Sequence, residues 1–236
     1  MIENEVKVVL LGETAVGKSS IIKQFVDHEF DSEIGPSISS KFVSKEIELK
    51  EINKEIKINL WDTAGQERYR SLAKIFYKDA QIIIFVYDIT NKISFDSLSN
   101  FWYKEVIKNS LSNVIFAVVG NKIDLYEYSK VSEDEAKNWA DSINATFQLT
   151  SAKNNSGIDL LFENLIKKIY IPNFDYNKED DKNREEYEQK KFDEEREKRN
   201  KQNDDDDDEN IIPRGGSIIL NKKDISQHNK KKKKCC

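Results

Sequence analysis

The chain has 236 residues and a formal net charge of −5, from 38 basic and 43 acidic side chains. Apolar and polar runs alternate over residues 1–171, whereas residues 172–236 are mostly charged or Asn and hold too few apolar side chains to offset the entropy lost on folding. This pattern predicts one domain over 1–171 and a largely disordered tail over 172–236. No apolar run reaches the roughly 18 residues of a membrane span, and the terminal basic run lacks interleaved aromatic residues, which argues against nucleic-acid binding.

The apolar pattern predicts a doubly wound α/β fold. Three short runs rich in Val and Ile are typical of strands buried on both faces: residues 6–11, 82–87 and 114–119. Apolar and polar residues alternate on both sides of Asn53, which predicts an antiparallel hairpin over 41–61. Helical periodicity occupies the segments between and after the strands: residues 19–26, 95–108, 133–142 and 158–169. A mostly parallel sheet with one antiparallel strand should bind its ligand beyond the carboxyl ends of the strands.

The segment directly after the first predicted strand matches a phosphate-binding loop. Residues 12–19 read Gly-Glu-Thr-Ala-Val-Gly-Lys-Ser, which fits G-x-x-x-x-G-K-[ST]. Its glycines let backbone N–H groups converge on phosphate oxygens, while Lys18 reaches the β and γ phosphates and Ser19 binds Mg²⁺. The residues expected around the phosphates are Glu13, Thr14, Ala15, Val16, Gly17, Lys18, Ser19 and Ser20. The loop alone does not separate ATP from GTP.

A carboxylate, Asp62, stands at the end of the next predicted strand, within the run Trp-Asp-Thr-Ala-Gly-Gln-Glu over 61–67. There it is well placed to hold the metal through water, although a turn or helix cap is the alternative. Gly65 would offer its backbone N–H to the γ-phosphate, and Gln66 would orient the attacking water. Lys18, Gly65 and Gln66 are therefore the predicted catalytic residues.

A phosphate loop followed by D-T-A-G-Q-E resembles the Ras superfamily of small GTPases. The resemblance implies a six-stranded P-loop GTPase fold with helices on both faces. It also implies a further Mg²⁺ ligand at Ser37, where the family has Thr, so that Ser19, Ser37 and Asp62 are the predicted metal ligands; the alternative is that Ser37 is only a polar loop residue. Thr14 stands where Ras has Gly, which favours slow intrinsic hydrolysis.

A base-reading motif follows the strand predicted over 114–119. Asn121, Lys122 and Asp124 match N-K-x-D, and the Asp124 carboxylate can accept hydrogen bonds from N1–H and N2–H₂ of guanine. Adenine lacks this pair of donors, so the motif selects GTP over ATP. The family resemblance adds four residues around the base: Phe30, Ser151, Ala152 and Lys153.

Several runs resemble the Rab family, and most closely its early-endosomal subgroup: residues 12–20, 61–69, 68–73 and 87–90, together with the double cysteine at the end of the sequence. This resemblance covers residues 5–170 and the last two residues. It implies a monomer that recruits effectors through Phe42, Trp61 and Phe76, although these aromatic residues would also suit an ordinary core. An exchange factor would reload the site, and an activating protein would supply an arginine finger.

The tail carries the predicted membrane anchor. Cys235 and Cys236 are the only cysteines, which excludes a disulfide framework and fits a reducing compartment. The pair resembles the Rab double-geranylgeranyl signal, and two lipids beside the basic run 230–234 would anchor the chain to an anionic leaflet. Residues 218–220 resemble the patch that escort and extraction proteins grip. The acidic run 204–209 is expected to stay hydrated, with a basic partner as the alternative.

Segment 183–201 of the tail pairs Glu with Lys or Arg at i,i+4, which favours a solvated helical spacer. The leading functional hypothesis is a GTP/GDP-cycling switch that regulates membrane trafficking from the cytosolic face of an intracellular membrane. A GTP-binding scaffold with negligible hydrolysis is the main alternative. A nuclear-transport GTPase is opposed by the double cysteine, and a P-loop ATPase or kinase is opposed by Asp124.

Overall fold

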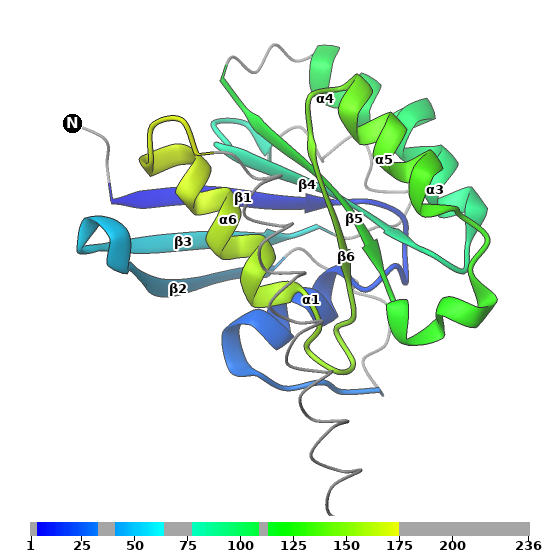
Figure 1. Ribbon diagram of the computed structural model, residues 1–236, viewed down its shortest axis with the longest axis horizontal. Helices are drawn as coiled ribbons and strands as arrows, with labels where there is room; N and C mark the ends of the chain where they lie inside the picture. Colours follow the sequence, from blue (N-terminus) through cyan, green and yellow to red (C-terminus); the bar gives the residue numbers. More distant parts are fainter. Residues whose placement is uncertain (1–3, 33–40, 64–76, 109–112, 175–236) are drawn as a thin grey trace, which may run out of the picture. The chain divides into compact units, whose positions relative to one another are not determined.

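The computed structural model describes residues 4–32, 41–63, 77–108 and 113–174. In these ranges the chain forms one six-stranded sheet in the order β2-β3-β1-β4-β5-β6 (Figure 1). Its strands are β1 (Glu5–Leu11), β2 (Lys41–Leu49), β3 (Lys54–Asp62), β4 (Ile82–Asp88), β5 (Ile115–Asn121) and β6 (Thr146–Thr150). All neighbouring pairs are parallel except β2 and β3. The mostly parallel sheet with one antiparallel strand is thus confirmed, while β6 is a strand that the apolar pattern does not locate.

Helices cover both faces of the sheet, as predicted (Figure 1). On one face, α1 (Lys18–Asp27) and α6 (Ile158–Tyr170) pack together with the strands in one apolar cluster. On the other face, α3 (Lys92–Ser97), α4 (Tyr103–Lys108) and α5 (Glu133–Ser142) contribute to a second cluster. Two buried faces explain why the parallel strands read as continuous apolar runs.

Strand β4 shows how one run of residues feeds both clusters. Ile82 and Ile84 face the cluster with α1 and α6, whereas Ile83 and Phe85 face the cluster with α3, α4 and α5. Every residue of β4 is buried. Because successive side chains in a strand point to opposite faces, an alternating pattern would have left one face of this strand exposed.

The predicted hairpin is confirmed and is closed by a 3₁₀ turn, η1 (Lys50–Ile52). Asn53 adopts the left-handed conformation with φ 48°, which Asn tolerates better than most residues. Lys167 of α6 reaches the turn, where its Nζ lies 2.7 Å from a carboxylate oxygen of Glu51. This contact ties the end of the hairpin to the helix that covers it.

The helical region after β4 differs from its prediction in two respects. It begins at Lys92 instead of residue 95, because the Asn91 side chain caps it by accepting hydrogen bonds from the backbone N–H groups of Ile93 and Ser94. Its middle turn, η3 (Leu98–Trp102), is π-helical and joins α3 to α4. The other three predicted helices lie within one residue of their expected bounds.

Within the described ranges, no helix has both the length and the apolar character needed to cross a bilayer. This finding agrees with the absence of a long apolar run from the sequence.

Candidate functional site

A cavity of about 380 Å³ opens where the phosphate loop and the loops after β5 and β6 meet. This is the crevice beyond the carboxyl ends of the strands where ligands bind in open α/β sheets, and its volume suits a small molecule. Twelve of the predicted binding residues line it: Thr14, Ala15, Gly17, Lys18, Ser19, Ser20, Phe30, Asn121, Lys122, Asp124, Ala152 and Lys153. The sequence motifs, which are more than 100 residues apart, therefore converge on one cavity.

Lys18 begins α1 and is 5% exposed. Its Nζ donates hydrogen bonds to the backbone carbonyls of Gly12, at 2.9 Å, and Glu13, at 2.8 Å. Burial lowers the pKa of the Lys18 ammonium to about 8, although the nearby carboxylates of Asp62 and Glu13 partly oppose this shift. A buried cation beside a helix N-terminus makes the floor of the cavity suitable for an anion.

Two glycines of the loop are required by its backbone path. Gly17 has φ 100°, and a Cβ there would lie 2.2 Å from Nδ2 of Asn121. Gly12 has φ 149°, and a Cβ there would lie 2.1 Å from the carbonyl oxygen of Val86. Both positions combine a conformation that favours glycine with a close approach that excludes any side chain.

Ser19 and Asp62, the two described residues of the predicted Mg²⁺ site, bring two oxygen atoms together beside the cavity. The Ser19 hydroxyl donates to Oδ2 of Asp62 at 2.6 Å, and Asp62 is 2% exposed at the end of β3. Thr63 follows it and donates from Oγ1 to the carbonyl of Leu10 at 2.7 Å, which joins the ends of β3 and β1. A hydroxyl and a carboxylate are the hard oxygen donors that Mg²⁺ prefers, so the residues present fit this ion.

Asn121, which is 1% exposed at the end of β5, connects this strand to two loops that border the cavity. Its Nδ2 donates to the carbonyl of Val16 at 2.9 Å. Its Oδ1 accepts from Oγ1 of Thr150 at 3.2 Å and from the backbone N–H of Ala152 at 3.3 Å. One amide therefore holds the phosphate loop and the loop after β6 in register with β5.

Asp124 is exposed and lies on η4 (Ile123–Tyr128), directly beside the cavity. Its Oδ1 accepts a hydrogen bond from the Ser151 hydroxyl at 2.6 Å. Ser151 belongs to the loop after β6 and is fully buried, so it can hold the carboxylate in one orientation. Phe30, with 42% of its surface exposed, lines the same cavity.

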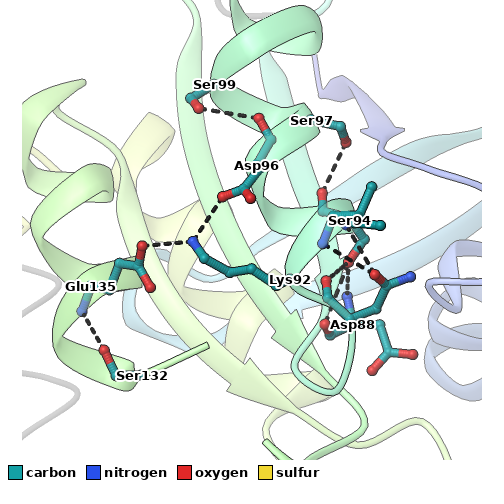
Figure 2. A network of polar contacts seen from close by, with 10 residues as sticks. Asp88, Lys92, Ser94, Asp96, Ser97, Ser99, Ser132 and Glu135 are labelled. Atoms are coloured by element: carbon teal, nitrogen blue, oxygen red, sulfur yellow. Dashed lines mark hydrogen bonds and ion pairs between the residues drawn. The ribbon is translucent and has the colours of Figure 1, made fainter. Parts of the chain in front are cut away.

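Asp88, which was given no role from the sequence, connects the base-reading motif to its neighbours. Its Oδ2 lies 2.7 Å from Nζ of Lys122, and Lys122 also donates to the carbonyl of Ala15 at 2.8 Å. The backbone of Asp88 is bonded to Ser94 at the start of α3, in a network that Figure 2 shows beside the Lys92 contacts to Asp96 and Glu135. The sequence signal that could have identified Asp88 is its place as a carboxylate at the end of a buried strand.

The structure places the predicted effector residues Phe42 and Trp61 side by side on β2 and β3. Their ring centroids are 5.1 Å apart in an edge-on arrangement, and Phe42 is 53% exposed. Trp61 is half-buried and packs against the second core cluster, while its role in binding effectors stays a prediction. The pair is an exposed aromatic surface of the kind enriched in protein interfaces.

The remaining predicted residues fall into two groups. Glu13, Val16, Asp62 and Ser151 contact the lining residues through the hydrogen bonds above. Ser37, Gly65, Gln66, Phe76, Cys235 and Cys236 lie outside the described residues. The cavity also has lining residues that were not predicted: Asp31, Ser32, Thr63 and Leu125.

A buried lysine within a glycine-rich loop, a carboxylate at the metal position and a second carboxylate at the base position define a P-loop nucleotide-binding protein of the small GTPase type. Comparison with known proteins agrees with this class. The model of the Ras family matches residues 7–171. The chain therefore belongs to the Ras family of small GTPases.

The similar proteins place the chain among the Rab GTPases. It is 44% identical to Ras-related protein Rab-22A of Homo sapiens over 173 residues, which cover 73% of this chain and 87% of that protein. It is 42% identical to Rab-31 of Rattus norvegicus over 165 residues, or 70% and 83% of the two chains. It is 38% identical to Rab-1 of Theileria parva over 163 residues, or 69% and 73%. The predicted resemblance to the early-endosomal Rab subgroup is thus confirmed, and the chain is a GTP hydrolase that acts as a switch in membrane trafficking.

Proposed function

We propose that the cavity holds GTP or GDP with its phosphates on the loop 12–19 and its base against Asp124. The observation that carries this proposal is that the buried Lys18 ammonium and the Asp124 carboxylate line the same cavity. Backbone N–H groups of the loop would bind the phosphate oxygens, and Lys18 would neutralise the β and γ phosphates. Guanine would donate N1–H and N2–H₂ to the Asp124 carboxylate, while Phe30 packs against the ring.

Ser19 and Asp62 are the described residues that would hold Mg²⁺, with Ser37 as a further ligand. When bound, the ion would supply positive charge that offsets the negative charge developing on the phosphates during hydrolysis. The Ser19 hydroxyl oxygen lies 2.6 Å from Oδ2 of Asp62, so the two oxygens are close enough to contact the same ion. Gly65 would bind the γ-phosphate, and Gln66 would orient the attacking water. Binding of GTP would fix the positions of these residues and so create the effector surface.

Phe42 and Trp61 would form the described part of that effector surface, completed by Phe76. An exchange factor and an activating protein would set the rates of reloading and hydrolysis. The domain over 1–171 would be monomeric and joined through the tail 172–236 to an endosomal membrane, where lipids on Cys235 and Cys236 anchor it. Escort and extraction proteins would hold the same tail in the cytosol.

Base specificity tests the proposed site. Asp124→Asn replaces one acceptor oxygen with an NH₂ donor, which no longer matches guanine but matches the C2 carbonyl of xanthine. We expect the variant to lose at least a hundredfold in GDP affinity and to gain affinity for xanthosine diphosphate. Asp31→Asn, on another lining residue, is the matched control. Equal uptake of GDP by both variants, or equal binding of ATP and GTP by the wild type, would overturn the proposal.

A GTP-binding scaffold is the alternative, because Ser37 and Thr14 depart from the Ras pattern. Single-turnover hydrolysis separates the two. The switch predicts slow release of phosphate from bound GTP that a Rab-activating protein accelerates, and Gln66→Leu should suppress that acceleration. If the wild type released phosphate no faster than Gln66→Leu, both with and without the activating protein, the scaffold would be favoured.

A further inference from the structure

Trp102 links the outer helical layer to the phosphate loop. Its indole Nε1 donates a hydrogen bond to Oε1 of Glu13 at 3.3 Å, across 89 residues of sequence. Trp102 is 2% exposed, so the indole cannot turn to another partner without repacking its cluster. The buried ring thus presents its only polar atom to the second residue of the loop.

Trp102 is the last residue of a π-helical turn. Segment η3 (Leu98–Trp102) lies between two α-helical segments, and the backbone N–H of Tyr103 bonds to the carbonyl of Leu98, five residues earlier. A π turn inserts one extra residue into the helix and rotates the residues that follow it. Such insertions lower the stability of a helix and occur frequently at functional sites. Here Trp102, the last residue of the turn, is the one that contacts the phosphate loop.

Glu13 connects this contact to the buried cation. Its backbone carbonyl accepts a hydrogen bond from Lys18 Nζ at 2.8 Å, while its side chain accepts from Trp102. A residue held at its side chain has fewer backbone conformations, so its carbonyl stays directed at the lysine. Glu13 is therefore bonded both to the buried ammonium and to a residue in the helical layer.

We propose that Trp102 is a positioning residue for nucleotide retention: its hydrogen bond to Glu13 holds the phosphate loop in the conformation that fixes Lys18. This inference rests on the proposed nucleotide site and goes beyond it, because no sequence motif assigns Trp102 or the Glu13 side chain a role. Loss of the bond loosens the loop and speeds release of GDP. A movement of the helical layer that separates Trp102 from Glu13 would likewise speed the release of GDP.

The test measures release of fluorescently labelled GDP from the full chain. Trp102→Phe keeps an aromatic ring and removes the donor, and Glu13→Ala removes the acceptor. We expect each to speed release about threefold to tenfold, in line with the loss of one hydrogen bond. The double variant should be no faster than the faster single variant, since both remove the same interaction. Glu13→Gln, which keeps an acceptor oxygen for the indole, should release GDP more slowly than Glu13→Ala does.

Trp139→Phe is the matched control. This tryptophan packs on the same cluster, with its ring against Phe85, Phe95 and Tyr103. It should leave GDP release within about twofold of the wild type. Thermal unfolding of each variant with its nucleotide removed separates lost packing from lost positioning, because weaker binding of GDP by itself lowers the unfolding temperature of the GDP-bound protein.

The indole N–H resonances in an NMR spectrum give a readout independent of kinetics. Glu13→Ala should shift the Trp102 resonance and leave that of Trp139 in place. Additive effects of the two single variants, or a Trp102 resonance unmoved by Glu13→Ala, would overturn the inference. If the wild type captured no GDP at all, the proposed site itself would be wrong.

Discussion

Asp88 at the end of β4 and Lys122 after β5 form an ion pair, with 2.7 Å between Oδ2 and Nζ. The Asp88 side chain is 11% exposed, so solvent screens the pair less than it screens a surface pair. Lys122 also donates to the carbonyl of Ala15. Through one lysine, the carboxylate therefore restrains both the base-reading motif and the phosphate loop.

The first prediction concerns this ion pair. Asp88→Asn should speed GDP release about fivefold to twentyfold, because the lysine loses its anionic partner while the side-chain size is kept. Asp96→Asn is the control, since Asp96 pairs with Lys92 at the same distance of 2.7 Å but is 48% exposed and distant in sequence from the loop (Figure 2). Release rates of labelled GDP check the difference. Equal rates for the two variants would contradict the role given to Asp88.

A second prediction uses Gly17. Gly17→Ala places a Cβ within 2.2 Å of the Asn121 amide at φ 100°, so the loop and the amide must move apart. The purified variant should contain less than about a tenth of the wild-type amount of bound nucleotide. Gly157→Ala is also strained, with φ 71° and a Cβ at 2.5 Å from the carbonyl of Leu149, but it lies before α6 and outside the cavity lining. It should lower stability by about 1 to 3 kcal/mol and keep its nucleotide.

Proton uptake on binding follows from the lowered pKa of Lys18, about 8 in the nucleotide-free protein. Bound phosphate favours the charged ammonium and raises this pKa again. Affinity for GDP should therefore fall as pH rises above about 8, and binding should take up more protons at pH 9 than at pH 7. Calorimetry in buffers of different ionisation enthalpy counts those protons. Lys18→Arg, charged at both pH values, should remove the difference.

The same pKa sets the pH dependence of stability without nucleotide. Because the folded-state pKa lies below the ordinary Lys value of 10.5, the unfolded chain binds more protons between about pH 8 and pH 10.5. The contribution of Lys18 to the free energy of unfolding therefore rises over this interval as pH rises. Urea unfolding of the nucleotide-free wild type and Lys18→Arg should diverge over the same interval. Parallel curves would contradict the assigned pKa.

The last prediction concerns Asn164 on α6, which is fully buried. Neither side-chain atom has a hydrogen-bond partner in the part of the chain that the structure describes. Asn164→Ala removes two unsatisfied groups and should raise the free energy of unfolding by about 1 to 2 kcal/mol. Asn138→Ala, at an exposed position of α5, gains only helix propensity and should add about 0.5 kcal/mol or less. A destabilised Asn164→Ala protein would show that the amide has a partner, such as a buried water.

The motifs were readable from the sequence because their chemistry depends on local spacing. The run from Gly12 to Ser19 needs only a preceding strand and a following helix, and both were visible in the apolar pattern. Asn121 and Asp124 likewise belong to one short run at a strand end. Parallel strands bring their carboxyl ends to the same edge of the sheet, so the local motifs were sufficient to predict a common site.

Strand β6 could not be predicted from the sequence, since its five residues Thr146–Thr150 include three polar side chains and form no apolar run. Its place is decided by pairing with β5 at the edge of the sheet. The π-helical turn could not be predicted from the sequence either. Residues 95–108 fit an ordinary helical period, and nothing in their pattern marks the residue that the π turn inserts.

By itself, the sequence determined that this chain belongs with the Rab GTPases, and it predicted a guanine-nucleotide site built on a P-loop. Tertiary structure alone decided which side chains support that site from a distance. Asp88 meets Lys122 through the register of β4 and β5, and Trp102, in a π-helical turn of another layer, meets Glu13 of the phosphate loop. Contacts of this kind depend on how separate elements pack, and residue spacing within one segment carries no record of that packing.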